Sequence, residues 1–465
     1  MRSMFGCLVL LMGCTVGPDY ERPPVKTPLA YKENNSWVPA NPKDDIDRGS
    51  WWQLYKDPIL DNLEKQIDIS NQNLKAAEAS YRQANALIDE TRATLFPTLS
   101  LNTSGTRSET STLPPKNSYL VSAAASWTPD IWGSIRRNLE SDVANAEASA
   151  AEIGSARLSA QGLLATIYFE LMIQDELERI LNDIVKADKG ILDIVKNQYA
   201  VGVAAQSDVL TARSQYETAT SAAIQAHVNR MLDEHAIAVL IGKTPSEFSL
   251  APTKGVFHIP NVPIGLPSTL LERRPDIAAA ERAMASANAQ IGVQVAAYYP
   301  NLTFSPSYGY TASTFSKLIQ ASNSFWSVGP SLAETFFDAG ARDARVDQAR
   351  AAYDQSVATY RQTVLNAFQN VEDNLGALRT YTQQSIVSKA TVADDRRNAK
   401  ITLNQYKEGI VALNNVLTAQ TTLLNQEETD LTVDQNRLIA SVGLIQALGG
   451  GWNTQQMDAP LSKVP

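Results

Sequence analysis

Hydrophobic positions recur every three or four residues through much of the second half of the chain. They are Val346, Ala349, Tyr353, Val357, Tyr360, Val364, Phe368, Val371, Leu375 and Leu378. This spacing predicts a long helix with an apolar seam close to the coiled-coil period. The first half repeats the pattern at Leu139, Val143, Ala146, Ala150 and Ile153. An unbroken helix from Ile135 to Tyr199 would be roughly 100 Å long at about 1.5 Å per residue, which a globular domain seldom needs.

A second pattern, alternation of apolar and polar residues, predicts strands. It runs from Pro97 to about Thr110, from Tyr119 to Ile131 after a Pro-Pro turn, and through 301–311 and 325–336 around a Ser-rich loop. Each segment is about as long as the ~9–11 residues that cross a bilayer at a tilt. Candidates for interfacial aromatic girdles are Tyr119, Trp127, Tyr308, Tyr310, Phe325 and Trp326. A soluble antiparallel sheet is the alternative interpretation.

Prolines separate these segments from helix-forming stretches rich in Ala, Leu, Gln and Glu. The predicted order is a helix, two strands and long helices, and this order then occurs a second time. Identities support a duplication: Asn197-Gln198-Tyr199 with Gly202 recurs as Asn404-Gln405-Tyr406 with Gly409, an offset of 409 − 202 = 207. Pro97 and Pro300 match at 300 − 97 = 203. We infer two copies of one unit of about 200 residues.

The predicted domains follow from this duplication. The first repeat spans 58–244, with strands at about 97–131, and the second spans 267–451, with strands at about 300–336. Residues 245–266 form a linker and 452–465 a tail. Gly202 and Gly409 are the predicted helix-tip turns, because glycine accepts the positive φ at which a helix ends.

The N-terminus predicts a lipid anchor. Residues 1–13 form a short signal peptide, and Leu11-Met12-Gly13-Cys14 resembles a bacterial lipobox. Cleavage would leave Cys14 to carry the covalent lipid, and Thr15 after it favours the outer membrane. The alternative is a wrongly assigned start and a buried cysteine. Residues 14–57 are a Pro-rich strap that ends near Trp51-Trp52, predicted to be packing anchors.

Composition excludes several classes of protein. Among 465 residues, 40 Lys and Arg against 49 Asp and Glu give 40 − 49 = −9, which disfavours nucleic-acid binding. Two cysteines and three scattered histidines exclude a Cys/His metal cluster, so we expect no metal and no cofactor apart from the lipid. Gly242-Lys243-Thr244 lacks the earlier glycine of a phosphate-binding loop, since Ile237 stands there, and predicts a helix end. The sequence contains no nucleophile with nearby His and Asp residues, so nothing in it indicates an enzyme.

Four strands cannot close a barrel, and an open sheet edge is not tolerated in lipid. Protomers must therefore pool strands if the sheet is in a membrane. Three chains would give 3 × 4 = 12 strands, and two would give the minimal eight with a narrow bore. Composition does not choose between them.

Three motifs carry a resemblance to a known family. They are Cys14 to Pro23 (CTVGPDYERP), Leu271 to Ile277 (LERRPDI) and Leu448 to Trp452 (LGGGW). The chain resembles the outer-membrane factors of tripartite efflux pumps, in the lipoprotein branch (OprM-like, NodT-type) of the TolC superfamily. The resemblance implies a mainly α fold with a membrane β-barrel part. It implies a homotrimer with a 12-stranded barrel, a 12-helix periplasmic α-barrel and an equatorial domain.

The resemblance also implies function and partners. The protein would be a passive exit duct in the outer membrane of a Gram-negative bacterium, docked to a periplasmic adaptor and an inner-membrane transporter, in contact with outer-membrane lipid and not nucleic acid. Alternatives are a duct for metal ions or other small molecules, a type I export duct, or a coiled-coil lipoprotein without a pore. Arg273 and Arg274 are expected to be salt-bridge partners in the equatorial region.

The expected gate lies at the helix tips. In TolC-like channels, aspartates six and nine residues after the second tip glycine form acidic rings, and here those positions are Asn415 and Thr418. The inter-helix latch of the family maps onto Tyr406 and Asp208, so a hydrogen bond between them would hold the closed state, with Leu413, Val416 and Leu417 packing beside it. The alternative is that Tyr406 only packs and Asp208 only starts a helix.

Overall fold

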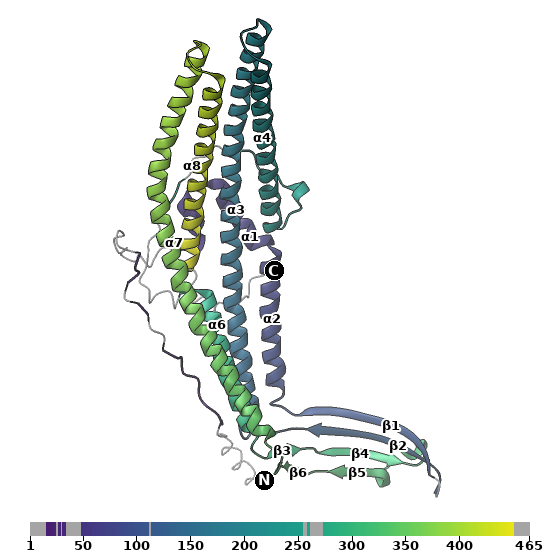
Figure 1. Cartoon of the computed structure of the whole chain (residues 1–465). Coiled ribbons are helices and arrows are strands. Elements are labelled where there is room, and N and C mark those ends of the chain that lie inside the picture. Colours follow the sequence, from purple (N-terminus) through teal and green to yellow (C-terminus); the bar gives the residue numbers. More distant parts are fainter. Residues whose placement is uncertain are drawn as a thin grey trace. The chain divides into compact units, whose positions relative to one another are not determined.

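The structure is a computed structural model that describes residues 15–24, 27–28, 30–33, 48–110, 113–253, 258–260 and 273–450 (Figure 1). The chain forms two compact units, each assembled from segments of both repeats. Unit 1 comprises Met1–Val25, Ala79–Ala151 and Ala278–Thr363. Unit 2 comprises Lys26–Glu78, Glu152–Ile277 and Val364–Pro465.

All the described α-helices except the first occur in pairs of equal length. They are α1 (Pro58–Ser70), α2 (Gln72–Ala93), α3 (Ser134–Ala200), α4 (Gln206–Leu240), α6 (Pro275–Ala296), α7 (Ala341–Lys407) and α8 (Leu413–Ala447), with short 3-10 turns that include η1 (Arg48–Tyr55) and η2 (Pro245–Glu247). α3 and α7 have 67 residues each, and α4 and α8 have 35 each. The starts of the long helices differ by 341 − 134 = 207, the offset found in the sequence.

The long helices end in the same hydrogen-bonded turn. Val203 N donates to Gln198 O at 2.8 Å, and Ile410 N donates to Gln405 O at 2.8 Å. Gly202 and Gly409 each have φ of 74°, and no atom lies within 4 Å of a Cβ added at either. Backbone conformation therefore requires glycine at these two positions, because other residues are strained at positive φ.

The first proline-free stretch is two helices and not one. α1 ends at Asn71, whose backbone is extended (φ −62°, ψ 122°). The Asn71 side chain accepts from Leu74 N at 3.0 Å and donates to Leu240 O at 2.8 Å. Asparagine competes well with helical hydrogen bonding in this way, and so it caps α2 while tying it to the end of α4.

The strands form two antiparallel sheets. A four-stranded sheet has the order β1 (Thr98–Thr110), β2 (Leu113–Ser126), β4 (Ser307–Ala312) and β5 (Ser324–Ser327). β3 (Asn301–Phe304) pairs with β6 (Pro330–Ala333) in a second sheet. β1 and β5 are the edges of the larger sheet, and each has one unpaired side.

The observed strand boundaries differ from the predicted ones at the prolines. Pro306 separates β3 from β4, and Pro330 begins β6, so each of the two segments predicted at 300–336 is divided. Pro114-Pro115 does not form a turn, because β2 runs through it. β2 pairs with β4 only over Tyr119 to Ala124, so the two prolines lie where only β1 is beside them. Proline is tolerated at such an edge because its missing N–H leaves no ladder bond broken.

Packing confirms the apolar seam and the tryptophan anchors. In unit 2, Val371 and Leu375 are fully or nearly fully buried and share one cluster with Trp51 and Trp52, which are 4% and 3% exposed. In unit 1, Val346 and Tyr360 are buried. Among the described residues, no helix is both long enough and apolar enough to cross a membrane.

The start of the described chain is tied to unit 1. Val16 N donates to Trp132 O at 3.2 Å, and Arg137 of α3 bonds to Val16 O and to the Asp19 carboxylate. Gly17 lies so close to Gly292 of α6 that a Cβ would be 2.4 Å from the Gly292 Cα. The predicted anchor, Cys14, falls outside the described residues, but its neighbour Thr15 lies against Gly133 at the start of α3.

Candidate functional site

The helix tips meet in one apolar cluster of unit 2. Ends of all four long helices contribute to it: Ile191, Leu192, Val195, Val209, Ala212, Tyr406, Leu413, Val416 and Leu417. Leu413, Val416 and Leu417 are buried on the first turns of α8. A tip that packs this way holds the two helix hairpins together by burial of apolar surface.

Tyr406 bonds across the tip to a residue that the sequence did not single out. Its hydroxyl donates to Gln198 Oε1 at 2.8 Å, where the expected acceptor was Asp208. Burial raises the pKa of Tyr406 first, and the charge of Asp208 raises it further. In the sequence, Gln198 was marked only by its place in the repeated Asn-Gln-Tyr motif.

Asp208 serves the start of α4. Its carboxylate accepts from Ala205 N at 3.3 Å, which satisfies a free donor and places a negative charge at the helix N-terminus. The Asp208 charge is therefore near Tyr406, but Asp208 does not accept the Tyr406 hydrogen bond. The hydrogen bond between α3 and α7 is a tyrosine–amide pair.

Asn415 and Thr418 lie on the opposite side of α8 from its buried residues. Both are exposed, whereas Val416 and Leu417 are buried. Two neutral side chains one turn apart therefore occupy the positions where the resemblance would have placed acids. A passage that they line carries no ring of negative charge from them.

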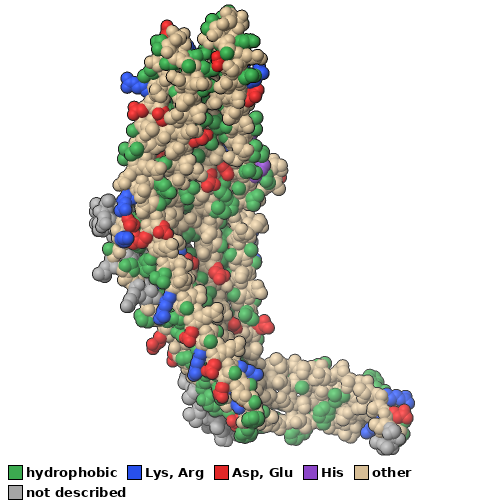
Figure 2. All heavy atoms as spheres, viewed as in Figure 1, with side chains coloured by type: hydrophobic (Ala, Val, Ile, Leu, Met, Phe, Trp, Pro, Cys, Tyr) green, Lys and Arg blue, Asp and Glu red, His purple; other side chains and the backbone are tan. Residues whose placement is uncertain are grey.

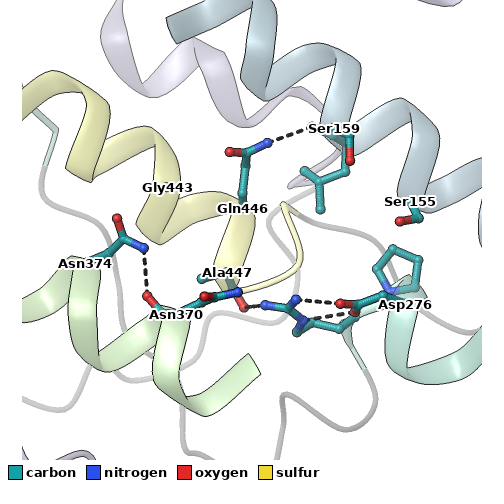
Figure 3. A pocket seen from close by; sticks show the side chains of 11 residues that line it. Ser155, Ser159, Asp276, Asn370, Asn374, Gly443, Gln446 and Ala447 are labelled. Atoms are coloured by element: carbon teal, nitrogen blue, oxygen red, sulfur yellow. Dashed lines mark hydrogen bonds and ion pairs between the residues drawn. The ribbon is translucent and has the colours of Figure 1, made fainter. Parts of the chain in front are cut away.

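A polar pocket lies in unit 2 beside the start of α6 (Figure 3). Arg274 donates to Asp276 at 2.6 and 3.0 Å and to Ala447 O at 2.9 Å, which agrees with the expected role as an ion-pair partner. Gln446 donates to Leu158 O at 3.2 Å. The pocket encloses about 280 Å³, slightly below the ~300–1,000 Å³ of typical ligand pockets. Because Arg274 is already paired with Asp276 and Ala447, we interpret the pocket as a packing gap between the helices and not as a ligand site.

His227 and the turn at Gly242 have local structural partners. In the part of the chain that the structure describes, no three His, Cys, Asp or Glu side chains converge on a point where a metal could bind. Nδ1 of the exposed His227 lies 3.4 Å from Glu178 Oε2. Gly242 lies in a helix-ending turn, with Lys243 N donating to Ala238 O at 2.9 Å. This is the helix end that its sequence predicted.

The larger sheet has two chemically different faces. Register aligns Leu101, Ala123, Tyr308 and Trp326 across the four strands on one face. Residues on the other face are mostly small and polar: Ser100, Asn102, Ser104, Ser118, Ser122, Ser307 and Thr311. Charged residues of the strands, Arg107, Glu109 and Lys116, lie near the hairpin between β1 and β2, and Figure 2 shows charged side chains at the far end of the sheet. The uncharged stretch, 98–106 in β1, has the length required to cross a bilayer.

A sheet with one apolar and one polar face, joined along the chain to very long helices that meet in apolar tips, is typical of a membrane channel protein. The chain belongs to the outer membrane efflux protein family, which matches residues 63–243 and 266–450. It is an outer-membrane exit duct for efflux, with the fold of TolC-like channels.

Individual relatives extend over nearly the whole chain. The solvent efflux pump outer membrane protein SrpC of Pseudomonas putida is 29% identical, with 97% of this chain and 98% of the relative aligned. The probable efflux pump outer membrane protein TtgC of the same species is 27% identical over 96% and 94%. The structure of the outer-membrane channel OprN matches with a TM-score of 0.85 and 29% identity, over 94% of this chain and 100% of that one.

Proposed function

We propose that three copies of the chain form the exit duct of a tripartite efflux system. The observation that carries this proposal is the four-stranded sheet, which has an apolar face, a polar face and two open edges, β1 and β5. In lipid those edges need partners. Three sheets closed edge to edge give a 12-stranded barrel with the polar faces toward water, and a 12-helix tunnel would extend into the periplasm.

Exposed apolar stripes on α4 and α7 support assembly of protomers into a ring. On α4, Leu210, Ile224 and Met231 are exposed at separations of 14 and 7 residues. On α7, Leu365 and Ile386 are exposed 21 residues apart. Multiples of seven keep a stripe on one side of a coiled-coil helix. The α4 stripe of one protomer is therefore suited to the α7 stripe of the next.

The tip loops support docking to a periplasmic adaptor. Val201, Val203 and Ile410 are 74%, 76% and 70% exposed around the tip glycines. Exposed apolar side chains grouped at one end of a protein mark an interaction surface. A partner with small apolar side chains at its own tip fits this chemistry, and an inner-membrane transporter would supply the cargo.

A lipid on Cys14 would anchor the duct beside its barrel. Thr15 lies against Gly133, just before α3 and after the strand β2, and this contact supports the proposal. Labelling cells with radioactive palmitate tests the anchor, and Cys14→Ser should abolish the label. Equal label in both proteins would remove Cys14 from this role.

The protein acts by conduction and without catalysis in this proposal. Its cargo class follows the transporter, so antibiotics, solvents, metal ions and siderophores are all compatible with a neutral, hydroxyl-lined barrel. Purified trimer in planar bilayers should show discrete single-channel conductance. A coiled-coil lipoprotein without a pore would show none, and that result would overturn the proposal.

A further inference from the structure

The connection between β4 and β5 is a folded segment. Residues 313–323 contain two short 3-10 turns, η4 (Phe315–Lys317) and η5 (Ala321–Asn323). Asn323 Nδ2 donates to Lys317 O at 2.7 Å, and Ser324 Oγ donates to Ala321 O at 2.8 Å. These bonds fix the direction in which the segment leaves the sheet.

That direction is toward the apolar face. The Phe315 ring packs edge-on against the Tyr119 ring, with 5.7 Å between centroids and 74° between planes. Tyr119 in turn covers Gly105, whose Cβ would be 3.4 Å from Tyr119 Cδ1. Gly105 shares a face of β1 with Leu99 and Leu101, because side chains alternate along a strand. The loop therefore folds down beside the apolar face and away from the polar one.

The loop presents the chemistry of a membrane interface. Phe315 and Ile319 are 71% and 76% exposed, although the loop around them is ordered by its own hydrogen bonds. Lys317 lies between them in sequence, and residues 313–323 (STFSKLIQASN) contain no acid. Apolar side chains flanking a lysine suit the boundary between acyl chains and anionic head groups.

We propose that loop 313–323 is a second membrane anchor, in which Phe315 and Ile319 insert into the outer leaflet and Lys317 pairs with lipid phosphate. The loop lies at the strand ends farthest along the chain from the helices, so in the duct it lies at the cell surface. Its apolar residues then leave the mouth of the duct uncovered. This proposal rests on the proposed function, because only the barrel puts the apolar face of the sheet in lipid.

Spin labels on single cysteines test the proposed loop anchor and the proposed barrel orientation separately. The chain has only two cysteines, Cys7 in the expected signal peptide and Cys14 at the expected lipid site, so the mature protein would present no free thiol and accepts labels through Ile319→Cys, Leu101→Cys or Asn102→Cys. Each labelled trimer is reconstituted in vesicles of phosphatidylethanolamine and phosphatidylglycerol. Collision with oxygen, which concentrates in lipid, is compared with collision with a water-soluble nickel chelate. We expect Leu101 and Ile319 to favour oxygen several-fold more than Asn102.

The controls decide which proposal fails. If Leu101 favours oxygen and Asn102 favours nickel while Ile319 behaves like Asn102, the loop lies in water and the anchor proposal is wrong. If Leu101 itself favours nickel, the barrel orientation is wrong. Conductance gives an independent measure: Phe315→Ser with Ile319→Ser should leave it unchanged, and an increase would mean that the loop covers the mouth.

Discussion

At the scale of single residues, the hydroxyl of Tyr406 donates the hydrogen bond that would hold the tip closed if the proposed gate lies there. Tyr406→Phe removes the bond to Gln198 without changing the packed ring. A neutral hydrogen bond contributes about 1 kcal/mol, so the balance between open and closed tips should shift roughly fivefold toward open. Single-channel recordings should show longer openings, and cells should admit more vancomycin.

Asp208→Asn is the matched control for this latch. It removes the charge near Tyr406 but leaves Gln198 as the acceptor, so it should change conductance much less than Tyr406→Phe. A larger effect from Asp208→Asn than from Tyr406→Phe would mean that the latch is the Tyr406–Asp208 pair after all.

Thr418→Asp should place an acid at the position where the resemblance expected one, and should strengthen the cation selectivity of the channel.

Glu64 is a buried acid that makes stability depend on pH. Burial, with the charge of Asp68 adding to it, raises the pKa of Glu64 from 4.5 to about 9. Between these values the folded protein keeps a proton that the unfolded chain releases, so stability from this group is greatest below pH 4.5 and falls as pH rises toward 9. Glu64→Gln cannot ionise and should flatten this decline in thermal unfolding between pH 6 and 8.5.

An exposed glutamate provides the comparison. Glu247→Gln alters the same charge at an exposed site and should keep the pH slope of the wild type. If Glu64→Gln also keeps that slope, Glu64 is ionised in the folded protein and another group supplies its counter-charge.

At the scale of elements, the helix tips depend on glycine in a way that a helix interior does not. Gly202→Ala places a side chain at φ 74° with no atom within 4 Å, so any loss is backbone strain of about 1–2 kcal/mol. Gly190, inside α3, also has no atom within 4 Å of an added Cβ. Gly190→Ala should stabilise by up to ~1 kcal/mol. Amide hydrogen exchange at the tip should therefore speed up in the first variant and slow in the second.

These two variants add the same methyl group, and only the backbone differs. Equal protection factors in both would mean that the tip turn relaxes to negative φ at little cost. The terminal glycine would then have no structural role in the turn.

Helices and tips were predictable from sequence, and contacts between elements were not. Spacing of Val346 to Leu378 determines a helix because its period is local, and Gly409 marks the end of that helix by its positive φ. Pro306 and Pro330 divided strands that alternation alone had joined. The acceptor for Tyr406 depends on how α3 and α7 lie to within about one ångström, since Gln198 and Asp208 are both near it. The hydrophobic periodicity of a sequence does not determine the distance between α3 and α7.

At the scale of the whole molecule, an apolar stripe on α4 should determine assembly. Ile224→Glu places a charge where a neighbouring protomer would bury it, at a cost of several kcal/mol. Light scattering in detergent should show trimer in the wild type and monomer in this variant. Gln225→Glu, one residue along and also exposed, should stay trimeric.

Chemical cross-linking gives the number of chains. The largest cross-linked species should contain three chains, because three four-stranded sheets close the proposed barrel. A series that ends at two or four would contradict the 12-stranded assembly, whatever the result for Ile224.

The constant offset between α3–α4 and α7–α8 means that the length of the duct is quantised. One inserted residue would rotate every later side chain by about 100° and turn the apolar seams outward. Seven residues, about two turns, restore the seam and add roughly 10 Å. They must be added to ascending and descending helices alike, and in both repeats, or the tips no longer meet. Lengthening this protein by heptads therefore requires four simultaneous insertions.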